Sequence, residues 1–378
     1  MTAPATQVLE SFSAVWNLEL RPAGCPTCKQ VYLLHPGQDQ SRCPLCGQAS
    51  LVPQPAAWLH PTAPELVVPF NPAIANQIPT LLTSFVKEVW LKPDDFTAAN
   101  LQQRLRPVYE TRWLVDGQVV GSWQAEEGFD YQVKSSQESY SSNGWRSRDV
   151  VETRIRWEAR LGQVQRAYQN ISVPAFSHQQ QLDALVGGYD TRAAVSYNPA
   201  VVGQAAVHIP DLQPDEVWQA AQSLFNQAAA GEIQNACQAQ HNRNVSIHAG
   251  YAGLNWTEML LPLYSSYYQD DDGRVHSILI NGQTGRIGGM RVASQHKGWQ
   301  WAGILGGSAL AALLAAVLFF LAGAMFPPAA LPGAILIIAA IVLGISAIFP
   351  AVSPWQWNRG QNETSWFSIP SSAEVSKK

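Results

Sequence analysis

The chain has 378 residues, of which 14% are charged and 47% hydrophobic, and its mean hydropathy is close to zero at −0.08. That average combines two different regions: residues 298–358 contain no Asp, Glu, Lys, Arg or His, whereas the residues before them include 21 basic and 26 acidic ones. The charge-free stretch excludes a wholly soluble protein, and the mixed remainder excludes a fibrous or fully disordered one. The slightly acidic remainder also argues against binding nucleic acid by bulk electrostatics.

Four of the five cysteines form two C-x-x-C pairs, Cys25/Cys28 and Cys43/Cys46, with 14 residues between the pairs. Each pair places two thiolates about one turn apart, and two such knuckles complete a tetrahedral set of four sulfurs, which favours Zn²⁺. We therefore predict a zinc ribbon over residues 1–51, with one structural zinc ion and no coordination position left for water. Two disulfides or a redox pair are the alternatives.

Residues 1–19 lack a basic segment followed by an apolar core, so we expect no secretory signal and reduced cysteines in the cytoplasm. A proline-rich linker is predicted over residues 52–64. Beyond it we expect an α+β body in two related units, residues 65–175 and 176–297.

The first unit opens with a short apolar strand at residues 66–70, and Asn71-Pro72 caps a helix that continues to about Trp90. A second helix is expected to open at residues 94–96. The pair Asp116-Gly117 predicts a hairpin between strands at residues 107–115 and 118–125. Residues 151–159 alternate between apolar and charged side chains, which predicts a half-buried strand.

The second unit has a helix from Pro214 to about Cys237, for which we expect a buried core thiol. Strands follow at about residues 245–251, 259–269, 274–280 and 286–292. The run of aspartates at residues 270–272 is typical of a tight turn, with a calcium loop as the alternative.

Two membrane spans are predicted, residues 301–326 and 329–350, each near the length that a bilayer requires. They form a transmembrane hairpin within residues 298–358, followed by a tail at residues 359–378. Tryptophans flank the hairpin, and basic residues precede and follow it, which predicts two cytoplasmic termini. A helical hairpin buried in a soluble domain is the alternative. Small residues in the first span permit close helix packing.

The chain resembles bacterial zinc-ribbon membrane proteins labelled "primosomal protein N′ (replication factor Y)-like" or "TFIIB-type zinc ribbon". The resemblance rests on the cysteine pairs, on Leu-Pro-Leu-Tyr at residues 261–264 and on Asn-Gly-Gln-Thr-Gly-Arg-Ile-Gly at residues 281–288, and the chain departs from the family pattern at residues 108–113. It implies a scaffold anchored in the bacterial inner membrane that works with a sister membrane protein and with proteins of the phage-shock-protein-A and flotillin-like kinds. No G-x₄-G-K-[ST] loop for ATP phosphates is present, so helicase activity is not expected.

We expect an interaction scaffold that assembles with itself or a sister protein and contacts the lipid bilayer, and we do not expect an enzyme. The eight histidines match no metalloenzyme or catalytic-triad spacing. A nucleic-acid-binding zinc ribbon tethered to the membrane is the alternative. The arginine-rich residues 146–160, interleaved with acidic residues, predict a solvated face, with an anionic-lipid or protein-binding patch as the alternatives.

Overall fold

The structure is a computed structural model that describes residues 13–38, 41–55, 63–142, 144–324, 326, 328 and 330–363. It is a mixed α+β protein with a large sheet, a cysteine cluster near its N-terminus and two apolar C-terminal helices. The chain divides into two compact units. Unit 1 comprises Met1–Thr111, His178–Ile209 and Leu260–Lys378, and unit 2 comprises Arg112–Ser177 and Pro210–Met259.

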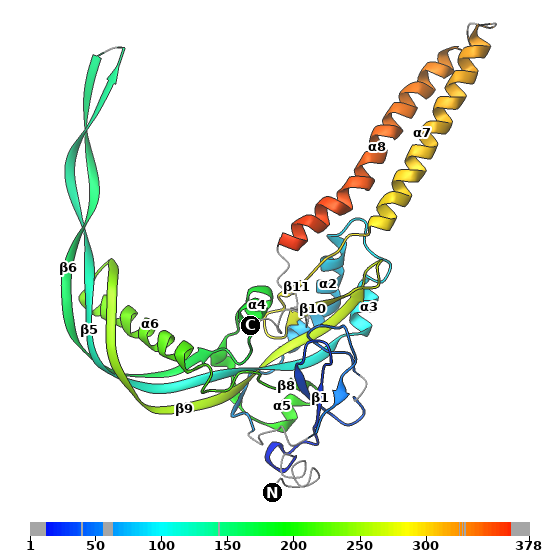
Figure 1. Ribbon diagram of the computed structural model, residues 1–378. Helices are drawn as coiled ribbons and strands as arrows, with labels where there is room; N and C mark the ends of the chain where they lie inside the picture. Colours follow the sequence, from blue (N-terminus) through cyan, green and yellow to red (C-terminus); the bar gives the residue numbers. More distant parts are fainter. Residues whose placement is uncertain are drawn as a thin grey trace, which may run out of the picture. The chain divides into compact units, whose positions relative to one another are not determined.

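The described strands form one eleven-stranded sheet, in which β5 and β9 continue from one unit into the other (Figure 1). The strands are β1 (Arg21–Gly24), β2 (Val31–Leu34), β3 (Val52–Pro53), β4 (Leu66–Val67), β5 (Arg106–Ser141), β6 (Gly144–Val173), β7 (Val195–Ser196), β8 (Ala206–His208), β9 (His241–Gln269), β10 (Val275–Asn281) and β11 (Ile287–Gly289). The main order is β11-β10-β9-β5-β8-β2-β1-β3, with β6 beside β5 and with β4 beside β7 and β9.

The described helices are α2 (Pro72–Lys87), α3 (Ala98–Gln103), α4 (Gln179–Val186), η2 (Thr191–Ala193), α5 (Pro199–Val202), α6 (Trp218–Cys237), α7 (Gln295–Gly323) and α8 (Ala330–Glu363). The predicted start of the first of these is confirmed: Pro72 occupies its first turn, and the side chain of Asn71 accepts a hydrogen bond from the Ala73 amide. This helix ends at Lys87, slightly before the predicted Trp90.

In unit 1, α2 and α3 cover β9 and β10. Leu82 and Phe85 of α2 meet Tyr268 and Ile278 of the sheet in one buried cluster, together with Phe96 from the segment before α3. A second cluster joins Trp16 to strands β2, β4, β5, β8 and β9. Burying these apolar side chains supplies the main stabilisation of the unit.

In unit 2, α6 packs on one face of β5 and β6 through Ala221, Phe225 and Ala229. The buried partners of these side chains on the strands include Val119 and Tyr168. The end of α6 at Cys237 agrees with the predicted one, but the Cys237 side chain is only partly buried, so the expectation of a core thiol there was wrong.

The hairpin predicted at Asp116-Gly117 was wrong, because β5 runs through both residues. The pairing with β6 shifts between Val115 and Gly117, so an irregularity in the ladder takes the place of a turn. The Asp116 carboxylate accepts a hydrogen bond of 2.7 Å from the amide of Asn170 on the neighbouring strand. The chain reverses instead near residues 141–144.

The strand predicted at residues 151–159 exists within β6, but it is not half-buried. Val151 is 61% exposed and Ile155 is 39% exposed, although both belong to the alternating apolar set.

The strands predicted at residues 245–251 and 259–269 are parts of the single strand β9. The aspartate run forms the predicted turn, and the Asp270 carboxylate accepts hydrogen bonds from the amides of Asp272 and Arg274 within it.

Helices α7 and α8 run side by side as an antiparallel pair (Figure 1). Both are long and apolar enough to cross a membrane. Close packing occurs where Gly298 faces the Pro350 carbonyl and where Gly333 faces Phe320, whereas Gly306 and Gly307 face open space. Among the small residues of the first span, Gly323 meets Ala330 of α8 and Ala316 is buried, so these residues contribute to the hairpin contact only in part.

Candidate metal centre

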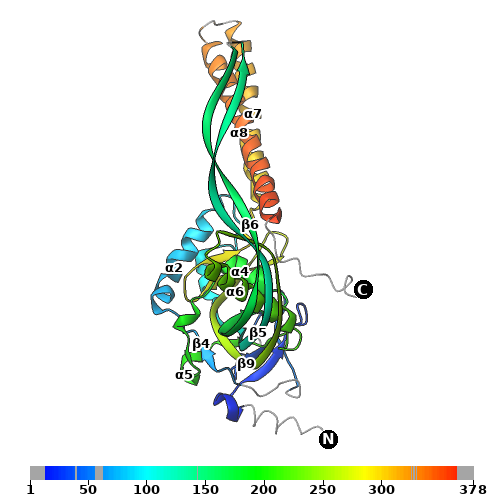
Figure 2. The same ribbon diagram turned by 90° about the vertical axis from the view of Figure 1, so that its left-hand side faces the viewer.

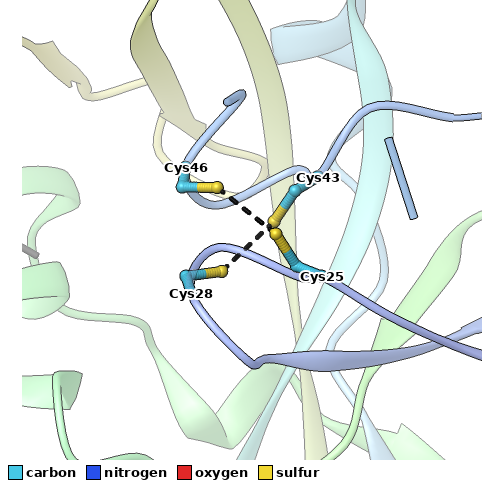
Figure 3. Close-up of side chains that lie close together, drawn as sticks. All are labelled: Cys25, Cys28, Cys43 and Cys46. Atoms are coloured by element: carbon cyan, nitrogen blue, oxygen red, sulfur yellow. Dashed lines mark hydrogen bonds between the residues drawn. The ribbon is translucent and has the colours of Figure 1, made fainter. Parts of the chain in front are cut away.

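The side chains of the four paired cysteines point toward one another (Figure 3). Cys25 directly follows β1, and Cys28 lies in the turn between β1 and β2, while Cys43 and Cys46 lie in a second turn before β3. The Cys25 and Cys46 sulfurs are 3.6 Å apart, and those of Cys28 and Cys43 are 3.5 Å apart. Both distances are far longer than a disulfide bond of about 2.05 Å.

The two turns have the same backbone construction. In the first, the Lys29 amide donates to the Cys25 carbonyl, and in the second, the Gly47 amide donates to the Cys43 carbonyl. Each turn ends in a residue with left-handed backbone conformation: Lys29 in the first turn and Gly47 in the second each have a φ of 64°. At Gly47 a Cβ atom would lie 2.9 Å from Val275, so only glycine fits this turn.

The spacing of the sulfurs fits a metal ion. A tetrahedral ion with metal–sulfur distances of about 2.3 Å requires sulfurs about 3.8 Å apart. Cys25 and Cys43 are each 2% exposed and Cys46 is 5% exposed, whereas Cys28 is partly exposed. These four residues can hold one metal ion with a complete set of protein ligands.

The proximity of the sulfurs also changes the acidity of the thiols. Hydrogen bonds from neighbouring thiols, that from Cys28 foremost, hold the pKa of Cys25 below its usual range. The same interactions raise the pKa of Cys28 and Cys43, with burial adding to the effect. The pKa of Cys46 is lowered as well. The cluster therefore favours thiolates at two of its sulfurs even before a cation neutralises them, and metal binding requires that the other two also lose their protons.

The sequence did not indicate a second group of potential ligands, which comprises Glu110, His178 and His208. Its geometry differs from that of the cysteines, because His208 Nδ1 lies only 2.6 Å from the Glu110 carboxylate. Two ligands of one metal ion at about 2.0–2.1 Å would be separated by about 3.3 Å. A distance of 2.6 Å is instead that of a charge-assisted hydrogen bond.

This buried pair connects the body of unit 1 to the cysteine cluster. Glu110 is on β5 and His208 is on β8, and the other ring nitrogen of His208 lies 2.8 Å from the side-chain oxygen of Gln30. The His208 ring also stacks on Tyr32, whose hydroxyl lies 4.0 Å from the Cys43 sulfur. The network positions β2, and with it the first knuckle, against the sheet.

Sequence reasoning missed this network because its members are distant along the chain. Residues 110 and 208 meet only because β5 and β8 pair in parallel, with Tyr109 opposite Val207. No periodicity or motif in the sequence predicts that pairing.

A polar network also fixes the base of the apolar helices. The Asn358 side chain of α8 accepts a hydrogen bond from the Ala293 amide and donates one to the Ala293 carbonyl. The indole of Trp357 donates to the Arg291 carbonyl, and Lys297 forms an ion pair with Asp94 at 2.6 Å. The end of α8 is thus tied to the start of α7 and to the body of unit 1.

No protein-family model, curated protein or solved structure matches the chain.

Proposed function

We propose that the protein is a membrane-anchored interaction scaffold with one structural zinc ion. The hairpin of α7 and α8 is the anchor, and the cysteine cluster is the zinc site. The proposal places the protein in the bacterial inner membrane with both termini in the cytoplasm, in agreement with the family that the sequence resembles. Its partners are a second copy or a sister membrane protein, and phage-shock-protein-A-like or flotillin-like proteins.

The observation that carries the proposal is the apolar surface of the helix pair. Leu318 of α7 is 67% exposed, and Ile345 and Phe349 of α8 are each 65% exposed. Of the described residues between Trp301 and Gly323 of α7 only Ala316 is buried, and between Leu331 and Phe349 of α8 only Gly333 and Ala340 are. Water-soluble proteins rarely expose apolar patches of this extent, whereas the hydrocarbon core of a bilayer is their natural solvent. A helical hairpin buried in a soluble domain does not match these exposures.

Zinc is the metal proposed for the cysteine cluster because four thiolates in tetrahedral arrangement favour it over harder cations. A closed set of four protein ligands leaves no place for an activated water molecule, so the ion has a structural role. Strands β1, β2 and β3 are two to four residues long. Such a small element depends on its metal for most of its folding free energy.

The nucleic-acid alternative gains no support from the side chains around the cluster. Arg42 donates to the Gly47 carbonyl, and Arg104 forms a two-pronged ion pair with Asp95. Arg21 pairs with Glu19. The charges of Arg21 and Arg104 are thus neutralised by carboxylates, so these guanidinium groups do not combine with Arg42 into an extended basic patch.

Alkaline extraction of native membranes tests the anchor. We expect the wild-type protein to stay in the membrane pellet after carbonate treatment. Leu314→Arg combined with Ile341→Arg places one charge in each proposed span, at a cost of about 2.5–3.5 kcal/mol each, and should release the protein from the pellet.

The matched control carries the same substitutions at exposed apolar positions outside the helices, Leu161→Arg and Val195→Arg. It should remain in the pellet like the wild type. Release of the wild-type protein by carbonate would show that the helices do not span the membrane.

A further inference from the structure

Strands β5 and β6 of unit 2 extend beyond helix α6 and strand β9, the elements that pack on or beside them. The pairing of β5 with β6 continues to Ser141 opposite Gly144. Helix α6 ends at Cys237, and β9 begins at His241, beside Asp130. From the pair of Phe129 with Arg156 to the turn, the structure is a twisted two-stranded ribbon (Figure 2). We call residues 129–156 the ribbon arm.

The ribbon arm lacks a core of its own. None of its described residues is buried. Tyr140 at its tip is 79% exposed, Trp145 is 67% exposed and Val151 is 61% exposed. A two-stranded ribbon without a third strand or a helix on one face is at most marginally stable in water. The exposed rings of Tyr140 and Trp145 lie 6.0 Å apart at the tip, and large apolar side chains left in water on such a ribbon indicate a surface that another molecule covers.

The register separates the charges of the arm onto two faces, because directly opposed residues of a strand pair point to the same side. One face, which we call the arginine face, has four arginines and one glutamate: Arg146, Arg148, Arg154, Arg156 and Glu152. The other, which we call the acidic-apolar face, has three carboxylates and one lysine together with four exposed apolar side chains: Asp130, Glu138, Asp149, Lys134, Tyr140, Trp145, Val151 and Ile155. Tyr131, which is 45% exposed, lies on the arginine face opposite Arg154.

Part of this charge is already neutralised along the strand. Arg154 pairs with Glu152 at 3.1 Å, and Arg156 pairs with Glu158 at 3.0 Å. Nearer the tip, Arg146 and Arg148 form no ion pair with any described residue, and neither does Asp149. The unneutralised charges of opposite sign are therefore concentrated on opposite faces of the distal part of the arm.

We propose that the ribbon arms of successive copies of this chain pack face to face, with the arginine face of one copy on the acidic-apolar face of the next. The two faces are complementary in charge. They can also form cation–π contacts, since guanidinium groups stack on aromatic rings such as those of Tyr140 and Trp145.

Contacts of this kind already occur at the root of the arm within one chain. The Arg243 guanidinium lies 4.1 Å from the centre of the Trp157 ring, and Arg160 lies 5.7 Å from that of Phe129. In the proposed assembly, the apolar side chains that the ribbon leaves in water become buried between arms.

The proposed contact joins two different faces, so it is heterologous. Each copy keeps one free face after pairing, and association continues beyond the dimer into a ring or an open chain. This inference rests on the proposed scaffold function for its biological meaning. The association itself is a property of the arm and can be measured independently of membrane insertion.

The test uses the full chain in mild detergent and two charge-reversal variants. Arg146→Glu with Arg148→Glu makes both faces acidic, and Glu138→Lys with Asp149→Lys makes both faces basic. Sedimentation velocity of the wild type should show species larger than a dimer whose mass falls with dilution and with added salt. Assemblies of each variant alone should dissociate, because the affinity between its copies is reduced about tenfold or more.

The decisive sample is an equimolar mixture of the two variants, because the acidic faces of one then meet the basic faces of the other. Mixed assemblies of wild-type mass should return.

Matched controls reverse two exposed charges outside the arm, Arg21→Glu with Arg274→Glu and Glu19→Lys with Asp272→Lys. These controls should sediment like the wild type. Far-ultraviolet circular dichroism and zinc content of all variants should equal those of the wild type, which excludes misfolding as the cause.

A wild-type protein that stays monomeric over a hundredfold range of concentration would overturn the proposal. Variants that keep the wild-type mass, or a mixture that fails to reassociate, would do the same.

Flotation with vesicles of pure phosphatidylcholine or with added phosphatidylserine distinguishes a lipid surface as the occupant. If Arg146→Glu with Arg148→Glu abolished a phosphatidylserine preference and left the mass unchanged, the arginine face would bind lipid, and the proposal would be wrong. Failure of the anchor would appear separately, as wild-type protein released by carbonate.

Discussion

Replacing Glu127 by methionine should stabilise unit 2. Glu127 lies on β5 beneath the end of α6 and is 0% exposed, and neither of its carboxylate oxygens has a hydrogen-bond partner among the described residues. The residue opposite it on β6 is Glu158, which takes the nearby Arg160 as its own partner at 2.5 Å. Burial raises the pKa of the Glu127 carboxyl, and Arg160 opposes that rise only in part.

The expected gain follows from removing an unsatisfied buried polar group. Methionine keeps the volume and the methylene stem of glutamate, so no cavity opens, and the free energy of unfolding should rise by about 1–3 kcal/mol at pH 7. For a unit of this size that corresponds to a rise of roughly 4–12 °C in the unfolding midpoint.

The effect should depend on pH with a defined sign. Because the folded-state pKa is raised, the wild type loses stability as pH rises from the ordinary glutamate value of about 4.3 up to the folded value. The methionine variant lacks this loss. The difference in unfolding free energy between the variant and the wild type should therefore be largest near neutrality and smaller below about pH 4.

Thermal unfolding of the full chain in detergent, followed by circular dichroism and tryptophan fluorescence between pH 4 and 8, measures this difference. Glu19→Met, at an exposed position outside the ribbon arm, is the matched control and should change stability by less than about 0.5 kcal/mol. A lower midpoint for Glu127→Met at pH 7, or a gain that is the same at pH 4 and pH 7, would refute the reasoning.

Three further predictions concern unit 1. Purified protein should contain one equivalent of zinc by elemental analysis, and Cys43→Ser should reduce this below half an equivalent and lower the unfolding midpoint; a full equivalent in the variant would contradict the assignment. Asp95→Asn should lower the free energy of unfolding by about 1–2 kcal/mol at pH 7, because the ion pair with Arg104, the main cause of the lowered pKa of Asp95, is lost. Chemical denaturation should show this difference between variant and wild type vanishing as pH falls below about 4. Gly298→Leu should destabilise the helix pair, since a Cβ there would meet the backbone of α8 at 2.5 Å. Gly307→Leu is the control, because Gly307 faces open space and a side chain there meets nothing. Equal unfolding midpoints of the two variants in detergent would refute this packing.

Features that depend on neighbours in the sequence were predictable. The spacing of Cys25, Cys28, Cys43 and Cys46 specifies two knuckles, and the structure brings all four sulfurs together. Asn71-Pro72 specifies a helix start through a local cap. The length of the apolar segments alone predicts two helices that can cross a membrane.

Features that depend on partners distant in the chain were not predictable. An Asp-Gly pair favours a turn locally, yet the long ladder between β5 and β6 holds Asp116 and Gly117 in an extended strand with a register shift. Alternation at residues 151–159 predicts a half-buried strand only if something covers the apolar face. Among the described residues Arg243 lies over Trp157, but Val151 and Ile155 stay exposed. The pair of Glu110 and His208 likewise requires the parallel pairing of β5 with β8.

The most direct test of the proposed anchor is the accessibility of single introduced thiols to a membrane-impermeant maleimide in intact spheroplasts. In a Cys237→Ser background, Leu331→Cys at the start of α8 should react from outside, because the proposed anchor puts that end of the hairpin beyond the membrane. Asp272→Cys, in an exposed turn of unit 1, should react only after permeabilisation. Reaction of Asp272→Cys in sealed spheroplasts, or protection of Leu331→Cys until they are opened, would contradict a body held at the cytoplasmic face by a membrane-spanning hairpin.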